Sequence, residues 1–94
     1  MWVSPQDYRV VGECLAAVRS RAGVTQRELT FRLSKPQSFV SAYENGQRRI
    51  DILEFLRIVR ALDLDPGTVF GEVADRAIES DAGASSSHAK GSSA

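Results

Sequence analysis

Residues 25–46 constrain the fold more than any other segment of the chain. Thr25 is a good helix N-cap, because its hydroxyl can accept a hydrogen bond from the free amides of the first turn. Glu28, three residues further on, completes the pattern of a capping box. Leu29 and Leu33 lie four residues apart, on one face of the helix that these signals predict from residue 26 onward.

A tight turn is predicted to separate this helix from a second one. Pro36 lacks an amide hydrogen and disfavours helical geometry in the residue before it, so the first helix ends there. The second helix is predicted over residues 37–44, with Val40 and Tyr43 as its inward pair, and Asn45-Gly46 supplies an exit that tolerates a left-handed backbone. The segment therefore has the form of a helix-turn-helix, whose two short helices need the rest of the chain for stability.

Three more helices are predicted around this pair, over residues 5–22, 52–62 and 66 to about 78. Capping residues precede them at Ser4, Asp51 and Asp65. Their apolar positions recur at helical spacing: Val11, Cys14, Leu15, Val18 and Ala22 in the first, Ile52, Phe55, Leu56, Val59 and Leu62 in the next, and Val69, Phe70 and Val73 in the last. No strand-like alternation is found, so the sequence predicts an all-α domain of five helices.

The domain is predicted to span residues 1–80. Small and polar residues dominate residues 81–94, which cannot bury enough apolar surface to offset the entropy of ordering and are predicted to form a disordered tail. No apolar run is long enough for a membrane span and no signal sequence is found at the start, so we expect a cytoplasmic protein without membrane contact.

The residues that carry chemistry in enzymes and metal sites are sparse. A single cysteine excludes an internal disulfide, and with a single histidine it cannot form a structural zinc site. Cys14 lies on an apolar helical face, which favours a buried core residue over an oxidation sensor. His88 stands beside serines in the predicted tail, where nothing would hold a catalytic geometry. We therefore expect no enzyme activity, no metal and no cofactor.

Charge is strongly segregated although the whole chain has a formal net charge of zero. Residues 19–60 contain 9 basic and 4 acidic side chains, a net charge of +5, whereas residues 61–81 contain 1 basic and 6 acidic side chains, a net charge of −5. A chain polarised in this way can present a basic face to phosphate groups.

Four sequence motifs are distinctive in their order and spacing: Arg-Ala-Gly-Val-Thr-Gln-Arg-Glu-Leu (21–29), Lys-Pro-Gln-Ser-Phe-Val-Ser (35–41), Tyr-Glu-Asn-Gly-Gln-Arg-Arg-Ile-Asp (43–51) and Phe-Leu-Arg-Ile-Val-Arg-Ala-Leu-Asp-Leu-Asp-Pro (55–66). They give the chain, over residues 9–73, a resemblance to the Cro/CI/Xre family of bacterial and phage DNA-binding domains. It implies a compact lambda-repressor-like fold with the helix-turn-helix at helices 2 and 3. The chain departs from the family at Thr30, where Ala is common, and at Ser34, where Gly is common.

The resemblance also implies which residues would contact DNA. The second helix of the motif would enter the major groove, with base contacts from Gln37, Ser38 and Ala42, and with Phe39 and Ser41 facing the groove or its wall. Gln can pair with adenine, Ser can donate or accept, and Ala can touch a thymine methyl. For Phe39, a contact with another protein is an equal alternative.

Phosphate contacts are implied at both ends of the motif. Gln26 would bind a phosphate and brace Gln37, the first residue of the recognition helix. The other residues expected on the DNA backbone are Thr25, Asn45, Arg48, Arg49, Lys35 and Arg19. A solvated loop is the alternative for Arg48 and Arg49, and part of the presence of Arg19 is explained by the helix dipole.

The sequence therefore predicts a bacterial or phage transcription regulator, a repressor that binds a pseudo-palindromic double-stranded operator as a homodimer and associates with the nucleoid when bound. The acidic fifth helix, or an apolar part of the fourth, is the expected dimer surface. The alternative is an antitoxin or adaptor-type module that binds a protein partner in a regulatory complex, which the zero net charge makes less remote.

Overall fold

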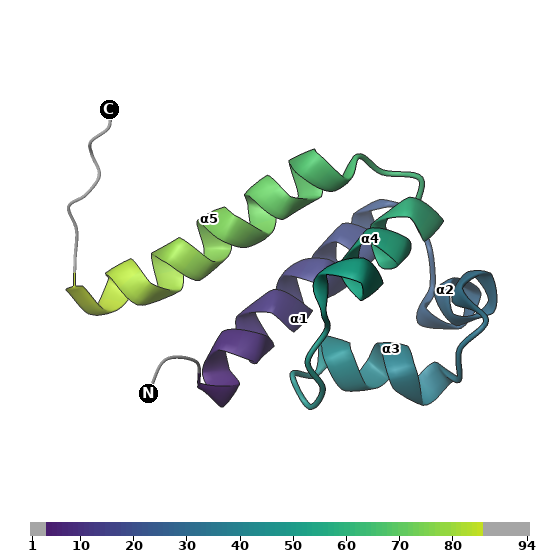
Figure 1. The fold of residues 1–94 in the computed structure, drawn as a ribbon, viewed down its shortest axis with the longest axis horizontal. Coiled ribbons are helices and arrows are strands. Elements are labelled where there is room, and N and C mark those ends of the chain that lie inside the picture. Colours follow the sequence, from purple (N-terminus) through teal and green to yellow (C-terminus); the bar gives the residue numbers. More distant parts are fainter. Residues whose placement is uncertain (1–3, 86–94) are drawn as a thin grey trace.

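The computed structural model describes residues 4–85, which form five α-helices (Figure 1). The helices are α1 (Pro5–Arg21), α2 (Gln26–Leu33), α3 (Gln37–Glu44), α4 (Ile52–Ala61) and α5 (Pro66–Ser85). The predicted all-α, five-helix class is therefore confirmed. α5 continues beyond the predicted domain boundary at residue 80 as far as Ser85. The rest of the predicted tail, including His88, lies outside the described residues.

The N-caps arise as the sequence predicts, with one exception. Asp51 and Glu54 form a complete capping box at α4, and Asp65 accepts hydrogen bonds from the Thr68 amide and hydroxyl at the start of α5. The Thr25 hydroxyl accepts from the Glu28 amide at 3.0 Å, but the Glu28 carboxylate does not complete the predicted box. It pairs instead with Arg32 at 3.0 Å, one turn further along α2, where opposite charges attract.

The core forms where the predicted apolar stripes meet. Figure 1 shows α1 running between α3 and α5, and α1 contacts both of these helices. The side chains of Leu15, Leu29, Val40 and Val59 are fully enclosed, and Cys14 is 2% exposed, which confirms its interpretation as a core residue. Burial raises the pKa of the Cys14 thiol, so the reactive thiolate is disfavoured.

The apolar stripes of α4 and α5 are not fully covered. Ile52 and Phe70 were predicted to point inward, yet they are 62% and 52% exposed, and the neighbouring Leu53 is 63% exposed. Helical periodicity identifies an apolar stripe, but its outer edge is buried only where another element reaches it. Ile52 and Phe70, which line one pocket between α4 and α5, therefore remain exposed and are here called the α4/α5 apolar surface.

Two backbone positions allow the chain to turn around α3. Ser34 ends α2 with φ 56° and ψ 42°, the left-handed conformation that the family commonly fills with Gly. Gly46 follows α3 with φ 77°, and a Cβ there would lie 2.9 Å from the Cα of Arg9 in α1. A left-handed residue therefore lies in each of the two turns that flank α3.

Candidate nucleic-acid interface

The first turn of α3 is open to solvent. Gln37 and Ser38 are exposed, and neither side chain hydrogen bonds to a residue that the structure describes. The N-cap is Pro36, which has no side-chain group to accept from the first-turn amides. Ser41 and Ala42, one turn further on, are half-buried. Of the predicted base contacts, Gln37 and Ser38 are therefore the most accessible.

The last turn of α3, by contrast, is anchored in the core. Val40, in the middle of α3, and Tyr43, in its last turn, are 0% and 1% exposed, which confirms the predicted inward pair. The carboxylate of the buried Glu44 accepts two hydrogen bonds from Arg19, at 2.7 and 3.1 Å. This pair connects α1 to α3, and a close approach of the two helices at Gly12 supports it, because a Cβ at Gly12 would lie 2.8 Å from the Glu44 carbonyl oxygen.

The predicted phosphate role of Arg19 does not fit this arrangement. Its Nη1 also donates to the Val24 carbonyl at 2.7 Å, and its side chain is only 16% exposed. Hydrogen bonding to Glu44 raises the pKa of Arg19 and so favours the charged guanidinium. Arg19 therefore holds the end of α3 against α1 through Glu44, and it is not among the proposed phosphate contacts.

The contact that Gln26 makes within the protein differs from the predicted one. Its Nε2 donates to Glu44 Oε1 at 2.8 Å, so its bracing partner is Glu44 and not Gln37. This hydrogen bond links the start of α2 to the end of α3. The turn, by contrast, joins the end of α2 to the start of α3. Gln26 remains half-buried and close to exposed Thr25 at the start of α2.

Three basic side chains flank α3 in the sequence and are exposed: Lys35 before it, and Arg48 and Arg49 after it. Arg48 is paired with Glu54 at 2.9 and 3.1 Å, and its guanidinium lies 4.6 Å from the centre of the Phe39 ring. Arg49 lies 4.9 Å from the centre of the Tyr8 ring in α1. Asn45, also predicted to reach the backbone, is exposed at the end of α3.

The basic face is partly neutralised within the protein. Among the described residues, four of the nine basic side chains of residues 19–60 form salt bridges: Arg19 with Glu44, Arg21 with Glu72, Arg32 with Glu28 and Arg48 with Glu54. The other five have no acidic partner within the part of the chain that the structure describes: Arg27, Lys35, Arg49, Arg57 and Arg60. Three of these five, Arg27, Lys35 and Arg49, lie within or beside the helix-turn-helix and are exposed there.

Sequence reasoning missed two residues that position α3. Glu44 was counted only as a charge, because its partners lie 25 and 18 residues away in the sequence. Gly12 was passed over, although a glycine inside a long amphipathic helix is a signal of close backbone approach. Glu54, which completes the capping box of α4, also accepts hydrogen bonds from Arg48. These bonds, followed by the one from the Asp51 amide, lower the pKa of the Glu54 carboxyl.

The geometry of α2, the turn and α3 defines a helix-turn-helix domain. A family model described as helix-turn-helix domain matches residues 10–69. A solved structure of an XRE-family like protein from Pseudomonas syringae pv. tomato str. DC3000 is 40% identical, with a TM-score of 0.66 over 74% of this chain and 85% of that chain. The chain therefore belongs to the XRE-type helix-turn-helix family.

A second solved structure, the clp gene regulator ClgR from Corynebacterium glutamicum, has a TM-score of 0.73 over 84% of both chains at 23% identity, which supports the fold alone. No curated protein matched the chain. Membership of the family supports a role in DNA binding and transcription regulation, and helix-turn-helix regulators of this family are generally not enzymes. Within residues 4–85, no helix is long and apolar enough to cross a membrane.

Proposed function

We propose that the protein is a sequence-specific repressor that reads the major groove of double-stranded DNA with α3. The observation that carries this proposal is the contrast between the open first turn of α3 and its buried last turn. Gln37 and Ser38 are free to meet base edges, while Val40, Tyr43 and Glu44 hold the helix in one orientation. Ala42 would touch a thymine methyl, and Ser41 would face the groove or its wall.

Phosphate contacts are proposed on both sides of this helix. Thr25 and Gln26 would meet the backbone at the start of α2, and Lys35, Asn45, Arg48 and Arg49 would meet it around α3. All but Gln26 are exposed, which supports their availability. Four of the basic side chains are already paired with acidic groups, and paired charges release fewer counterions on binding. We therefore expect the DNA affinity to depend only moderately on salt concentration.

Selection from random DNA duplexes tests the function directly. We expect enrichment of an inverted repeat whose half-sites lie about one helical turn apart. Binding should weaken as salt is raised, because counterions are released from the phosphates. Enrichment of no motif, with affinity equal for all duplexes, would contradict sequence reading by α3.

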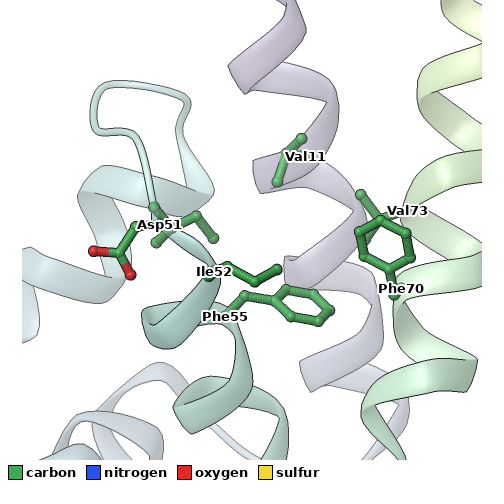
Figure 2. Close-up of a pocket in the computed structure, with 7 residues that line it drawn as sticks. Val11, Asp51, Ile52, Phe55, Phe70 and Val73 are labelled. Atoms are coloured by element: carbon green, nitrogen blue, oxygen red, sulfur yellow. The ribbon is translucent and has the colours of Figure 1, made fainter.

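The repressor is proposed to act as a homodimer through the α4/α5 apolar surface. Figure 2 shows the groove beside it, with Phe55 and Ile52 from α4 facing Phe70 and Val73 from α5. The groove has a volume of about 180 Å³, and the rings of Phe55 and Phe70 meet edge to face at 6.0 Å. Light scattering at concentrations that bind DNA should give a dimer, and Phe70→Glu should give a monomer that is still folded. A monomer whose footprint covers a single half-site would contradict the dimer.

A protein-interaction role, as an antitoxin or adaptor, is the second candidate. Phe31 on α2 is 86% exposed. This exposure favours the protein-interaction role, because a large apolar side chain so open to water is typical of a contact with another protein. A stable stoichiometric complex with a partner chain, together with unmeasurable DNA affinity, would favour this role over the repressor.

A further inference from the structure

The ring of Phe39 is fixed against the core rather than free at the surface. It is half-buried and packs against the buried cluster. Its closest aromatic neighbour is Tyr43, one turn further along α3, with ring centres 5.5 Å apart in an edge-to-face arrangement. Because Tyr43 is itself 1% exposed, the Phe39 ring is held from its inner side.

Two cations lie near the ring. Arg48 Cζ is 4.6 Å and Lys35 Nζ is 5.4 Å from its centre, both within the distance at which a cation is attracted to an aromatic ring. Lys35 precedes α3 in the sequence and Arg48 follows it. One ring on the recognition helix therefore contacts a basic side chain from each of the two segments that flank this helix.

Arg48 has a second support on α4. Its guanidinium donates to both oxygens of Glu54 and, at 2.6 Å, to the Arg49 carbonyl. Glu54 is fixed in turn, because its carboxylate accepts from the Asp51 amide at 3.0 Å in the capping box of α4. Arg48 is thus held between the ring on α3 and the first turn of α4, and it has less side-chain entropy to lose when it binds an anion.

We propose that Phe39 is a positioning residue whose ring orients Arg48 and Lys35 toward the DNA phosphates on either side of α3. This replaces the base contact predicted for Phe39 and rests on the proposed function. A ring that reads a base would alter which sequences are preferred. Loss of a ring that acts through Arg48 and Lys35 would weaken binding to every sequence alike and would lower the salt dependence.

The test compares Phe39→Leu with Phe39→Tyr, which keeps the ring, and with Phe31→Leu. Phe31→Leu is the matched control, because it makes the same chemical change on the exposed face of α2. Phe39→Leu should bind all duplexes roughly tenfold more weakly, because the Arg48 and Lys35 side chains would then have to be ordered on binding, with a smaller salt slope and an unchanged base preference. Phe39→Tyr and Phe31→Leu should bind like the wild type.

A double-mutant cycle identifies the residue through which the ring acts. In an Arg48→Ala background the loss caused by Phe39→Leu should shrink, because one of its two cations is gone. Full additivity, or a changed base preference in Phe39→Leu, would overturn the proposal. Thermal unfolding establishes that each variant is folded at the binding temperature. If Phe39→Leu is unfolded, Phe39→Met, whose side chain is closer in size to Phe, replaces it.

A measurement without DNA separates this proposal from the proposed function. In the free protein, the NMR signal of the Arg48 Nε–H group should be displaced by the ring current and should move toward its ordinary position in Phe39→Leu. If the wild type bound no duplex, the proposed function would fail and the phosphate role with it, whatever the NMR result. If the wild type bound DNA but Phe39→Leu changed neither affinity nor this signal, the positioning role alone would fail.

Discussion

The two ends of α3 have opposite environments although the helix is only eight residues long. The first turn presents Gln37 and Ser38 to solvent without a side-chain hydrogen bond to any described residue, whereas in the last turn Glu44 accepts three hydrogen bonds from Arg19 and Gln26. Base recognition and folding stability are thereby assigned to different ends of one short helix. Mutations at the two ends should separate these properties.

The largest effect is expected at the buried end. Glu44→Ala leaves the Arg19 guanidinium without its acidic partner in a site where its side chain is only 16% exposed. Removing one partner of a buried pair typically costs about 3–5 kcal/mol. The free energy of unfolding, measured with urea, should fall by that amount, and DNA binding should fall only as far as the folded fraction does.

Glu28→Ala provides the control for this prediction. It removes a salt bridge with Arg32 whose two side chains are 36% and 49% exposed. Exposed pairs contribute at most about 1 kcal/mol. If the two variants lost equal stability, the buried end of α3 would not be the anchor described above.

The exposed end should show the reverse behaviour. Gln37→Ala is expected to weaken binding to the preferred duplex by about 1–3 kcal/mol and to relax the preference at one base pair. The free energy of unfolding should change by less than about 0.5 kcal/mol, because the Gln37 side chain is exposed and forms no hydrogen bond with a described residue. Gln47→Ala, an exposed glutamine outside α3, is the matched control. A large loss of stability in Gln37→Ala would contradict the division between the two ends.

The extent to which the sequence predicted each end follows from the range of the interactions involved. The caps at Thr25 and Asp51 and the inward pair Val40 and Tyr43 depend on residues within one turn, and periodicity reveals them. The Gln26–Glu44 hydrogen bond depends on how two helices cross, and no local pattern encodes that angle. For this reason, the prediction that Gln26 braces Gln37 was wrong.

The same limit applies to the α4/α5 apolar surface. Helical spacing correctly selected Ile52 and Phe70 as members of apolar stripes, but it could not tell that no described element covers them. The roles of the predicted DNA contacts depend on a partner molecule, so they stay predictions. Arg19 is the exception, because its donors are visibly engaged by Glu44 and Val24.

A smaller effect is expected within the buried end itself. The Tyr43 hydroxyl is buried and has no hydrogen-bond partner among the described protein residues. Tyr43→Phe should therefore raise the free energy of unfolding by about 1 kcal/mol. A loss of stability would mean that the hydroxyl has a partner, such as a buried water.

The same hydroxyl predicts a dependence on alkaline pH. Burial, followed by the negative charge of Glu44, raises the pKa of Tyr43 in the folded state. Above about pH 10, the ordinary pKa of tyrosine, the unfolded chain loses this proton first, so the stability of the wild type should fall as the pH rises. Urea titrations between neutral pH and about pH 11 should show a shallower fall in Tyr43→Phe, which retains only the half-buried Tyr8.

The smallest effect is expected at Ser34, which connects α2 to the exposed end of α3. Its left-handed backbone, with φ 56°, costs a residue with a Cβ about 1–2 kcal/mol. Ser34→Gly removes this cost, while the greater freedom of glycine in the unfolded chain takes back about 0.4–1 kcal/mol. The net gain should be roughly 0.5 kcal/mol in urea unfolding, whereas Ser34→Ala, which keeps the Cβ, should show no gain. Because the Ser34→Gly substitution leaves Gln37 and Ser38 in place, the base preference in the duplex selection should stay the same. A shifted preference would mean that the strained turn sets the orientation of the reading end, and that the buried end does not hold α3 alone.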